Sequence, residues 1–201
     1  MKTFFTATIA SVLFAGIAAA GTVNFSNLTS TWEIQASGTP INGGFVAVGT
    51  GSGVDFSDPA AAQTALAANF TQFGASTDFG GAAAFGLSGF FSGVAQGDGG
   101  SAEFSGKPIW LVGGDGTGIA DSAHLFVIDT GATFEADAPL FSASVDANSG
   151  TPALGAAGGT PVAAGVAGAF QAVPVGVVIP EPGVSVLALF AAGFLALRRR
   201  R

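Results

Sequence analysis

The sequence predicts a mainly β protein: a small antiparallel sandwich or curled sheet with one packed helix, an N-terminal signal helix and a C-terminal transmembrane helix. Three observations lead to this prediction. Short runs rich in Val, Ile, Phe and Trp recur between glycine-rich turns, as in all-β domains. One stretch, residues 57–74, has the start signal and spacing of a helix. Both ends of the 201-residue chain carry an apolar run with basic residues beside it.

The predicted domain occupies residues 21–146, where apolar runs of strand length alternate with turns. In TWEIQAS, the apolar residues Trp32 and Ile34 alternate with Glu and Gln, so we expect a strand with one buried and one exposed face. Continuous apolar runs at residues 109–112 and 125–128 predict central strands. The runs that predict strands are residues 23–26, 31–37, 44–50, 82–95, 101–106, 107–114, 123–130 and 132–137.

The segment SDPAAAQTALAANFTQFG predicts the one helix of the domain. An Asp cap followed by proline in the first turn starts many helices, and Asp58 stands directly before a proline. Leu66, Phe70 and Phe73 recur at helical spacing and predict one apolar stripe. Gly74 stands where a glycine C-cap would end the helix.

Residues 147–179 carry no charge and are rich in Ala, Gly, Val, Pro and Thr. This composition predicts a spacer between the domain and the C-terminal tail. We expect about one added strand near its start and a flexible linker after it. A final strand pair around residues 161–178 is the alternative.

The N-terminus, residues 1–20, has the three parts of a secretory signal peptide. Lys2 supplies a short positive region, an apolar run follows, and Ala18 and Ala20 form a small-x-small cleavage site. The apolar run is shorter than the about 20 residues of a typical membrane-spanning helix. We therefore expect export with cleavage after Ala20; a buried N-terminal helix is the alternative.

The C-terminal tail, residues 180–201, combines a proline motif, an apolar run and a basic end. The motif is Pro180, Glu181 and Pro182, and the basic stop is Arg198, Arg199, Arg200 and Arg201. Between them, residues 183–197 predict a transmembrane helix. Arginines favour the cytoplasmic side of a membrane, which agrees with an exported N-terminus.

This tail resembles the sorting signal of PEP-CTERM proteins. The resemblance implies recognition by an exosortase, a membrane-embedded cysteine transpeptidase of Gram-negative bacteria that often make exopolysaccharide or biofilm. It implies a membrane anchor until processing and the cell surface or extracellular space afterwards. The GTPI–GGFVAVGT and GKPIWLV segments are also similar to those of a group of small exported PEP-CTERM proteins, and this likeness implies a domain outline without an activity.

Composition narrows the functions further. The net charge is −7, and between the two ends Lys107 is the single basic residue, so the surface would repel phosphate backbones and we expect no nucleic-acid binding. The chain has no cysteine, which excludes disulfides, thiol catalysis and thiolate metal sites. The GGDGTG loop has the glycines of a phosphate loop without the Lys-Ser/Thr that must follow.

The segment FVIDTGATF resembles the active-site turn of aspartic proteases, in which paired carboxylates share a proton. Asp129 would be the catalytic residue, with its partner coming from a second copy of the chain. The more common interpretation is a turn between two strands, because Asp and Gly are favoured there. Because the turn is the more common interpretation, a secreted hydrolase that uses Asp129 is only our second hypothesis.

The single histidine and three loop aspartates are the other candidates. A hydrolase triad would have to use His124, but Ser122 beside it lacks the Gly-x-Ser-x-Gly turn of a nucleophile. Asp98, Asp115 and Asp121 lie in glycine-rich loops, and oxygen ligands in flexible loops suit calcium. Turn chemistry alone is the more common explanation; a calcium-assisted adhesion or carbohydrate-binding module is the third hypothesis.

The leading hypothesis is an exported surface or matrix protein with no enzymatic activity indicated. We expect no cofactor, no catalytic residue and no metal site. Its expected partners are an exosortase, the membrane through the C-terminal helix, and envelope polysaccharide in the cell envelope or biofilm matrix.

Overall fold

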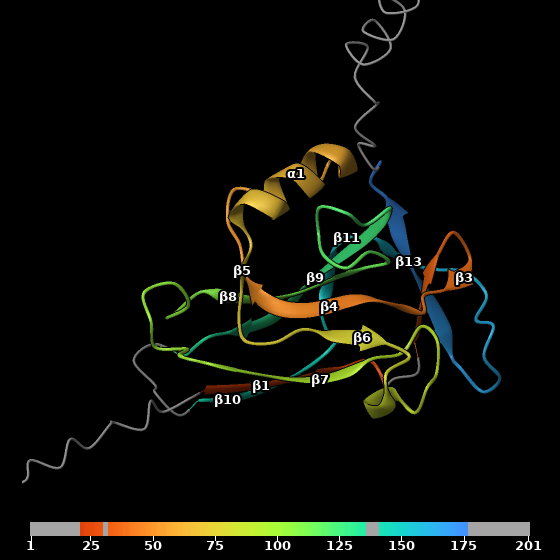
Figure 1. Cartoon of the computed structure of the whole chain (residues 1–201), viewed down its shortest axis with the longest axis horizontal. Coiled ribbons are helices and arrows are strands. Elements are labelled where there is room, and N and C mark those ends of the chain that lie inside the picture. Colours follow the sequence, from red (N-terminus) through yellow and green to blue (C-terminus); the bar gives the residue numbers. More distant parts are fainter. Residues whose placement is uncertain (1–20, 30–31, 136–140, 177–201) are drawn as a thin grey trace, which may run out of the picture.

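The computed structural model describes residues 21–29, 32–135 and 141–176. In this part of the chain the protein is mainly β with one α-helix, as the sequence predicts, and its sheets are open (Figure 1). The predicted signal and transmembrane helices lie outside the described residues.

The helices of the described residues are α1 (Pro59–Asn69) and the 3-10 helix η1 (Ala82–Ala84). The strands are β1 (Gly21–Ser26), β2 (Trp32–Ala36), β3 (Thr39–Pro40), β4 (Gly43–Thr50), β5 (Thr71–Gln72), β6 (Thr77–Phe79), β7 (Ser92–Gly97), β8 (Pro108–Gly114), β9 (His124–Thr133), β10 (Ser142–Asp146), β11 (Thr151–Leu154), β12 (Ala156–Ala157) and β13 (Gly168–Pro174).

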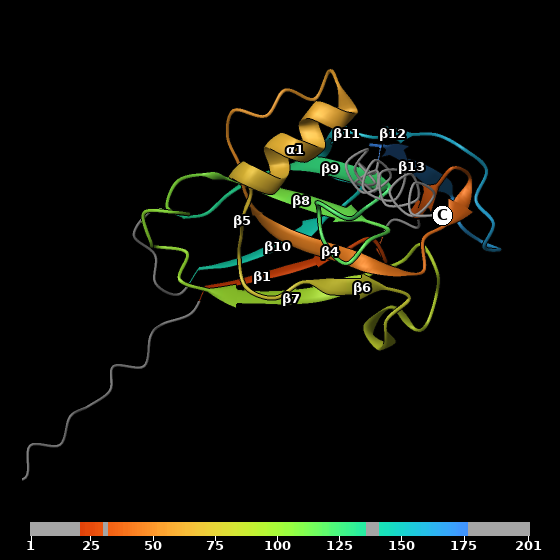
Figure 2. The same cartoon turned by 45° about the horizontal axis from the view of Figure 1, so that its top comes forward.

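Two sheets form two layers. The small sheet has the order β10-β1-β7, and the large sheet has the order β3-β2-β13-β9-β8-β4-β5, with β11 on β9, β12 on β13 and β6 on β4. Most pairs are antiparallel, but β1–β10 and β2–β13 are parallel. The small sheet lies along one face of the large sheet, and α1 lies on the opposite face (Figures 1 and 2).

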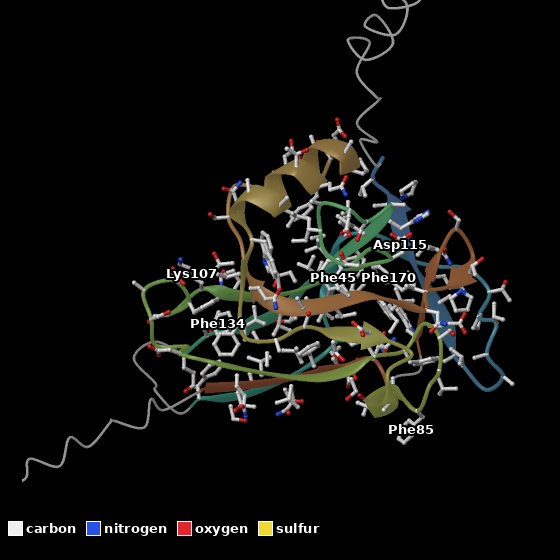
Figure 3. All side chains as sticks on the ribbon, in the orientation of Figure 1. Phe45, Phe85, Lys107, Asp115, Phe134 and Phe170 are labelled. Carbon is white, nitrogen blue, oxygen red and sulfur yellow. The ribbon has the colours of Figure 1, made fainter. Side chains whose placement is uncertain are left out.

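Phenylalanine rings fill the space between the two layers. Phe126 of β9 lies at the centre, with ring centroids 6.1 Å from Phe79, 6.5 Å from Phe91 and 6.1 Å from Phe170. Phe134 belongs to the same core, and Figure 3 labels both Phe134 and Phe170. Each ring removes on the order of 150–250 Å² from water, so these rings provide much of the stability of a chain without disulfides.

The apolar runs of β8 and β9, residues 109–112 and 125–128, have neighbours on both faces of the sheet, which explains why these runs are continuous. Phe126 and Ile128 face the phenylalanine core, whereas Leu125 and Val127 face a second core beneath α1. The prediction that these runs form central strands is therefore confirmed.

Helix α1 begins as predicted but ends earlier. Asp58 Oδ1 accepts hydrogen bonds from the backbone N–H groups of Ala60 and Ala61 at 3.0 and 3.2 Å. The helix ends at Asn69, because residues 71–72 leave it to pair with β4. The single stripe predicted for Leu66, Phe70 and Phe73 is therefore wrong: Leu66 is buried under the helix, whereas Phe73 packs in the phenylalanine core.

The prediction that Gly74 ends the helix is also wrong, because the C-cap is Phe70. Gly74 has a φ of +65°, and a Cβ there would lie 2.5 Å from the backbone nitrogen of Gln96. This glycine is needed where the chain passes close to β7.

The spacer predicted for residues 147–179 is wrong for most of its length. One strand near its start, β11, fits the expectation, but the flexible linker after it does not, because β13 lies between β2 and β9 in the large sheet. Phe170 is 1% exposed and belongs to the phenylalanine core. The folded unit therefore continues well beyond residue 146, nearer to the alternative of a final strand pair.

Of two further predicted strands, one is wrong and the other is right only at its end. Residues 101–106 form a series of turns, and of residues 82–95 only the end belongs to β7. The earlier part forms η1 and a turn in which Phe85 and Gly86 both have positive φ angles, +57° and +72°. The apolar residues of both segments predicted strands, but Gly86, Gly89 and Gly106 have positive φ angles and form turns there.

Candidate functional site

The only histidine lies between a serine and an aspartate in a hydrogen-bonded row. Ser37 Oγ is 2.9 Å from His124 Nε2, and His124 Nδ1 is 2.7 Å from Asp115 Oδ2. Asp115 and His124 are nine positions apart, whereas Ser37 precedes His124 by 87 positions. The sheet brings them together because β13 pairs with β2, which precedes Ser37, and with the first residues of β9, which begins at His124. Asp115 follows β8 directly, next to the start of β9 (Figure 3).

Asp115 is held firmly by the start of β9. Its Oδ1 accepts hydrogen bonds from the backbone N–H groups of Ala123 and His124 at 2.8 and 2.9 Å. Partial burial tends to raise the pKa of this carboxyl, but the hydrogen bonds from His124 and Ala123 and the attraction of the imidazole outweigh that effect and lower it. Asp115 therefore stays ionised over a wide pH range.

An ionised Asp115 selects the tautomer of the neutral histidine ring. A carboxylate only accepts hydrogen bonds, so Nδ1 of His124 must carry the proton that it donates. In the neutral ring, Nε2 is then an acceptor, and the Ser37 hydroxyl donates to it. The imidazole side chain is only 20% exposed, which restricts its movement. This is the tautomer and orientation of a serine–histidine–aspartate triad.

Ser37 occupies a conformation that is unusual for serine. With Gly38 it makes the two-residue turn between β2 and β3, where Ser37 has a φ of +49° and Gly38 a φ of +80°. For a residue with a Cβ atom the left-handed region costs roughly 1–2 kcal/mol, so Asn or Gly is the usual choice in such turns. The Gly38 N–H donates to Gln171 Oε1 at 3.1 Å, and a Cβ at Gly38 would meet nothing within 4 Å.

The loop of residues 115–122, predicted as a calcium candidate, is closed by its own hydrogen bonds. Asp121 accepts from the hydroxyl and N–H of Thr117 and from Gly118 N–H, and the Thr117 hydroxyl is the main cause of its lowered pKa. Ser122 is buried; its hydroxyl accepts from Gly116 N–H and donates to Gly118 O. Gln63 of α1 donates to backbone carbonyls of this loop and fixes it to the helix.

Carboxylates do not gather elsewhere in the described chain either. Asp98, in a separate loop, accepts a hydrogen bond from Gly100 N–H at 3.1 Å. Within residues 21–29, 32–135 and 141–176, no three His, Asp or Glu side chains lie close enough together to share a metal ion.

Asp129 lies inside strand β9, so the predicted turn between two strands is wrong. The strand stays continuous because Gly131, with a φ of +70°, allows a β-bulge against β8. Asp129 Oδ1 accepts a hydrogen bond from Gly131 N–H at 3.0 Å, and the hydroxyl of Thr130 donates to Ile109 O at 2.6 Å. In this arrangement the Asp-Thr-Gly segment shapes the bulge.

A second polar cluster surrounds Glu33, which the alternating pattern predicted to face solvent. Glu33 and Gln35 are both buried, because residues 158–163 cover this face of β2. The Glu33 carboxylate accepts from Val162 N–H at 3.1 Å, Ala163 N–H at 2.8 Å and the Gln35 amide at 2.6 Å. Burial tends to raise its pKa, but these hydrogen bonds lower it overall.

The predicted targeting residues lie outside the described part of the chain. They are Ala18, Ala20, Pro180, Glu181, Pro182, Arg198, Arg199, Arg200 and Arg201. Among the described residues, no helix is long and apolar enough to cross a membrane. The transmembrane helix predicted for residues 183–197 is therefore neither confirmed nor contradicted.

We compared the chain with family models, curated proteins and solved structures. No family model, no curated protein and no solved structure matches the chain. The functional argument therefore depends on the residues themselves. Of these, Ser37 was missed from sequence, since only a Ser-Gly pair typical of a turn marks it, 87 positions before His124.

Proposed function

We propose that the protein is an exported cell-surface or extracellular-matrix protein that is sorted through its C-terminal PEP-CTERM-like signal. The observation that carries the proposal is the extent of the described strands. Strand β1 starts at Gly21, directly after the predicted cleavage site at Ala20, and Gly21 already pairs with Gly97. Strand β13 ends at Pro174, shortly before the predicted motif at Pro180. Both predicted targeting signals thus lie outside the strands that the structure describes, next to their two ends.

The body of the protein suits this role. It holds one lysine against an excess of acids, and its core is built from aromatic rings without cysteine. An acidic surface remains soluble and binds anions poorly, so uncharged envelope polysaccharide is a more suitable partner than nucleic acid or phosphate-rich polymers. A core that needs no disulfide would fold in any extracytoplasmic compartment.

The intact mass of the mature protein from its native host tests the proposal. We expect a chain that begins at Gly21 and ends near Pro182, recovered from the cell surface or the medium. Replacing Pro180, Glu181 and Pro182 together by alanine should leave the four terminal arginines attached and keep the protein in the membrane fraction.

A matched control is Pro108→Ala, which removes an exposed proline at the start of β8, away from the motif. It should leave both mass and location unchanged. A wild-type protein that keeps residues 1–20, or that remains in the cytoplasm, would contradict export. Retention of all four arginines would contradict processing and leave a permanent anchor.

A further inference from the structure

We propose that Ser37, His124 and Asp115 form an acyl-transfer site that hydrolyses carboxylic esters. This inference goes beyond the proposed function, which concerns the destination of the protein. It also opposes the expectation, from the sequence, of a protein without enzymatic activity.

The first argument is the order of the hydrogen bonds. In a serine hydrolase the base must accept from the nucleophile through one ring nitrogen and be oriented through the other. His124 meets both requirements: Nε2 is 2.9 Å from Ser37 Oγ, and Nδ1 is 2.7 Å from Asp115 Oδ2. The two N–H groups that hold Asp115 Oδ1 prevent the carboxylate from turning away. Asp115 acts through the histidine and is a positioning residue.

The second argument is the backbone of Ser37. A φ of +49° is strained for serine, and an asparagine or glycine would make the same turn more readily. Strained residues are concentrated at functional sites, because the strain sets a side chain where the chemistry needs it. At this turn the strain places the Ser37 hydroxyl on the surface, within reach of His124.

The third argument is a donor for the developing oxyanion. The N–H of the residue after the nucleophile serves this purpose in many hydrolases. Here the Gly38 N–H donates to the amide oxygen of Gln171, which stands where a substrate oxygen would lie. A Cβ at Gly38 would meet nothing within 4 Å, so this side of the turn is open to an acyl group. A substrate oxygen would have to displace the Gln171 side chain, which also donates to Gln35 Oε1.

The reaction is balanced without any co-reactant except water. Ser37 Oγ bonds to the acyl carbon, its proton passes to His124 Nε2, and the alcohol leaves with that proton as the ester C–O bond breaks. Water then bonds to the acyl carbon and gives a proton to His124. The Ser37–acyl bond breaks, the serine oxygen takes the proton back, and a carboxylic acid is released.

An alkyl fluorophosphonate probe tests the site on the full chain, purified in a mild non-ionic detergent. The probe phosphonylates an activated serine oxygen and releases fluoride, and peptide mass mapping locates it. We expect labelling at Ser37 and a matching hydrolysis of 4-nitrophenyl acetate. His124→Gln should slow both by ~10²-fold or more, the usual contribution of a general base. Asp115→Asn should also slow labelling and change its pH profile, an effect that a purely structural contact would not have.

The control variants separate chemistry from folding. Ser37→Asn removes the hydroxyl but suits the left-handed turn, so it should abolish activity without lowering the melting temperature. Ser52→Asn changes an exposed serine in another loop and should alter neither. The proposal is overturned if wild-type Ser37 is not labelled, if folded His124→Gln labels at the wild-type rate, or if Ser37→Asn keeps the esterase activity. The first of these outcomes needs no variant to fold.

Discussion

The buried carboxylate of Glu33 provides the most direct test of how the late part of the chain is held. Glu33→Gln keeps the size of the side chain but replaces one oxygen by an NH₂ group. That group would face the N–H of Val162 or Ala163, so one of these donors would lose its acceptor. A hydrogen bond to a charged group is worth about 1.5–3 kcal/mol, and we expect a loss of about 2 kcal/mol at pH 7.

The pH dependence has a definite sign. The pKa of Glu33 is lowered in the folded protein from 4.5, so the ionised form is the one that folding favours. Its contribution is complete above pH 4.5 and is lost as the pH falls through the lower pKa of the folded state. Wild type should therefore lose stability on acidification below pH 4.5, and Glu33→Gln should lose less over the same range.

Urea unfolding followed by tryptophan fluorescence measures both effects, because Trp32 lies on the same strand as Glu33. A loss of 2 kcal/mol corresponds to a fall in melting temperature of roughly 4–8 °C for a domain of this size. The matched control is Glu103→Gln, which removes the same charge from an exposed turn. Equal stability of wild type and Glu33→Gln at pH 7, or an unchanged response to acid, would refute the reasoning.

Four further predictions concern the core and the chain length. Phe126→Ala should cost about 3–5 kcal/mol in urea unfolding, because several rings pack against Phe126. Gly113→Ala should cost about 1–3 kcal/mol in thermal unfolding, because its methyl group would lie 2.5 Å from the Phe126 ring. Phe85→Gly should not lower the melting temperature, since Phe85 is 81% exposed at a φ of +57° and glycine removes that strain (Figure 3). A chain ending at residue 146 should show no cooperative melt by circular dichroism, whereas one ending at residue 176 should.

The sequence predicts the parts of the fold in which one local signal decides the structure. The apolar runs of β8 and β9 and the Asp58 cap of α1 are such signals, and the structure confirms them. The alternation of apolar and polar residues in β2 predicted that Glu33 would be exposed, and this is wrong. Glu33 is buried because a loop about 130 residues later covers it and supplies N–H donors. The residues next to Glu33 in the sequence do not indicate that this loop will cover it.

The sequence singled out His124 and Asp115 separately, but their arrangement with Ser37 could not be predicted, for a similar reason. The row from Ser37 through His124 to Asp115 exists only because β13 joins two distant strands, and β13 was predicted to belong mostly to a flexible linker. Its sequence, GAFQAVP, is dominated by small residues and offers a single large ring, Phe170. Small residues suit a strand that fits between two others, but the same composition also suits a linker.

The position of β13 links the fold to the proposed sorting route. Because β13, the last strand of the described residues, joins β2 to β9, the large sheet is incomplete until residues 168–174 are available. A chain exported from its N-terminus would therefore complete its fold only after nearly all of the domain has crossed the membrane. Val175 is still buried in the core beneath α1 and donates its N–H to Ala123 O. Four residues separate it from Pro180 in the sequence, and four residues span at most about 14 Å. An enzyme acting on the motif would have to work close against the folded domain, which a long spacer would not require.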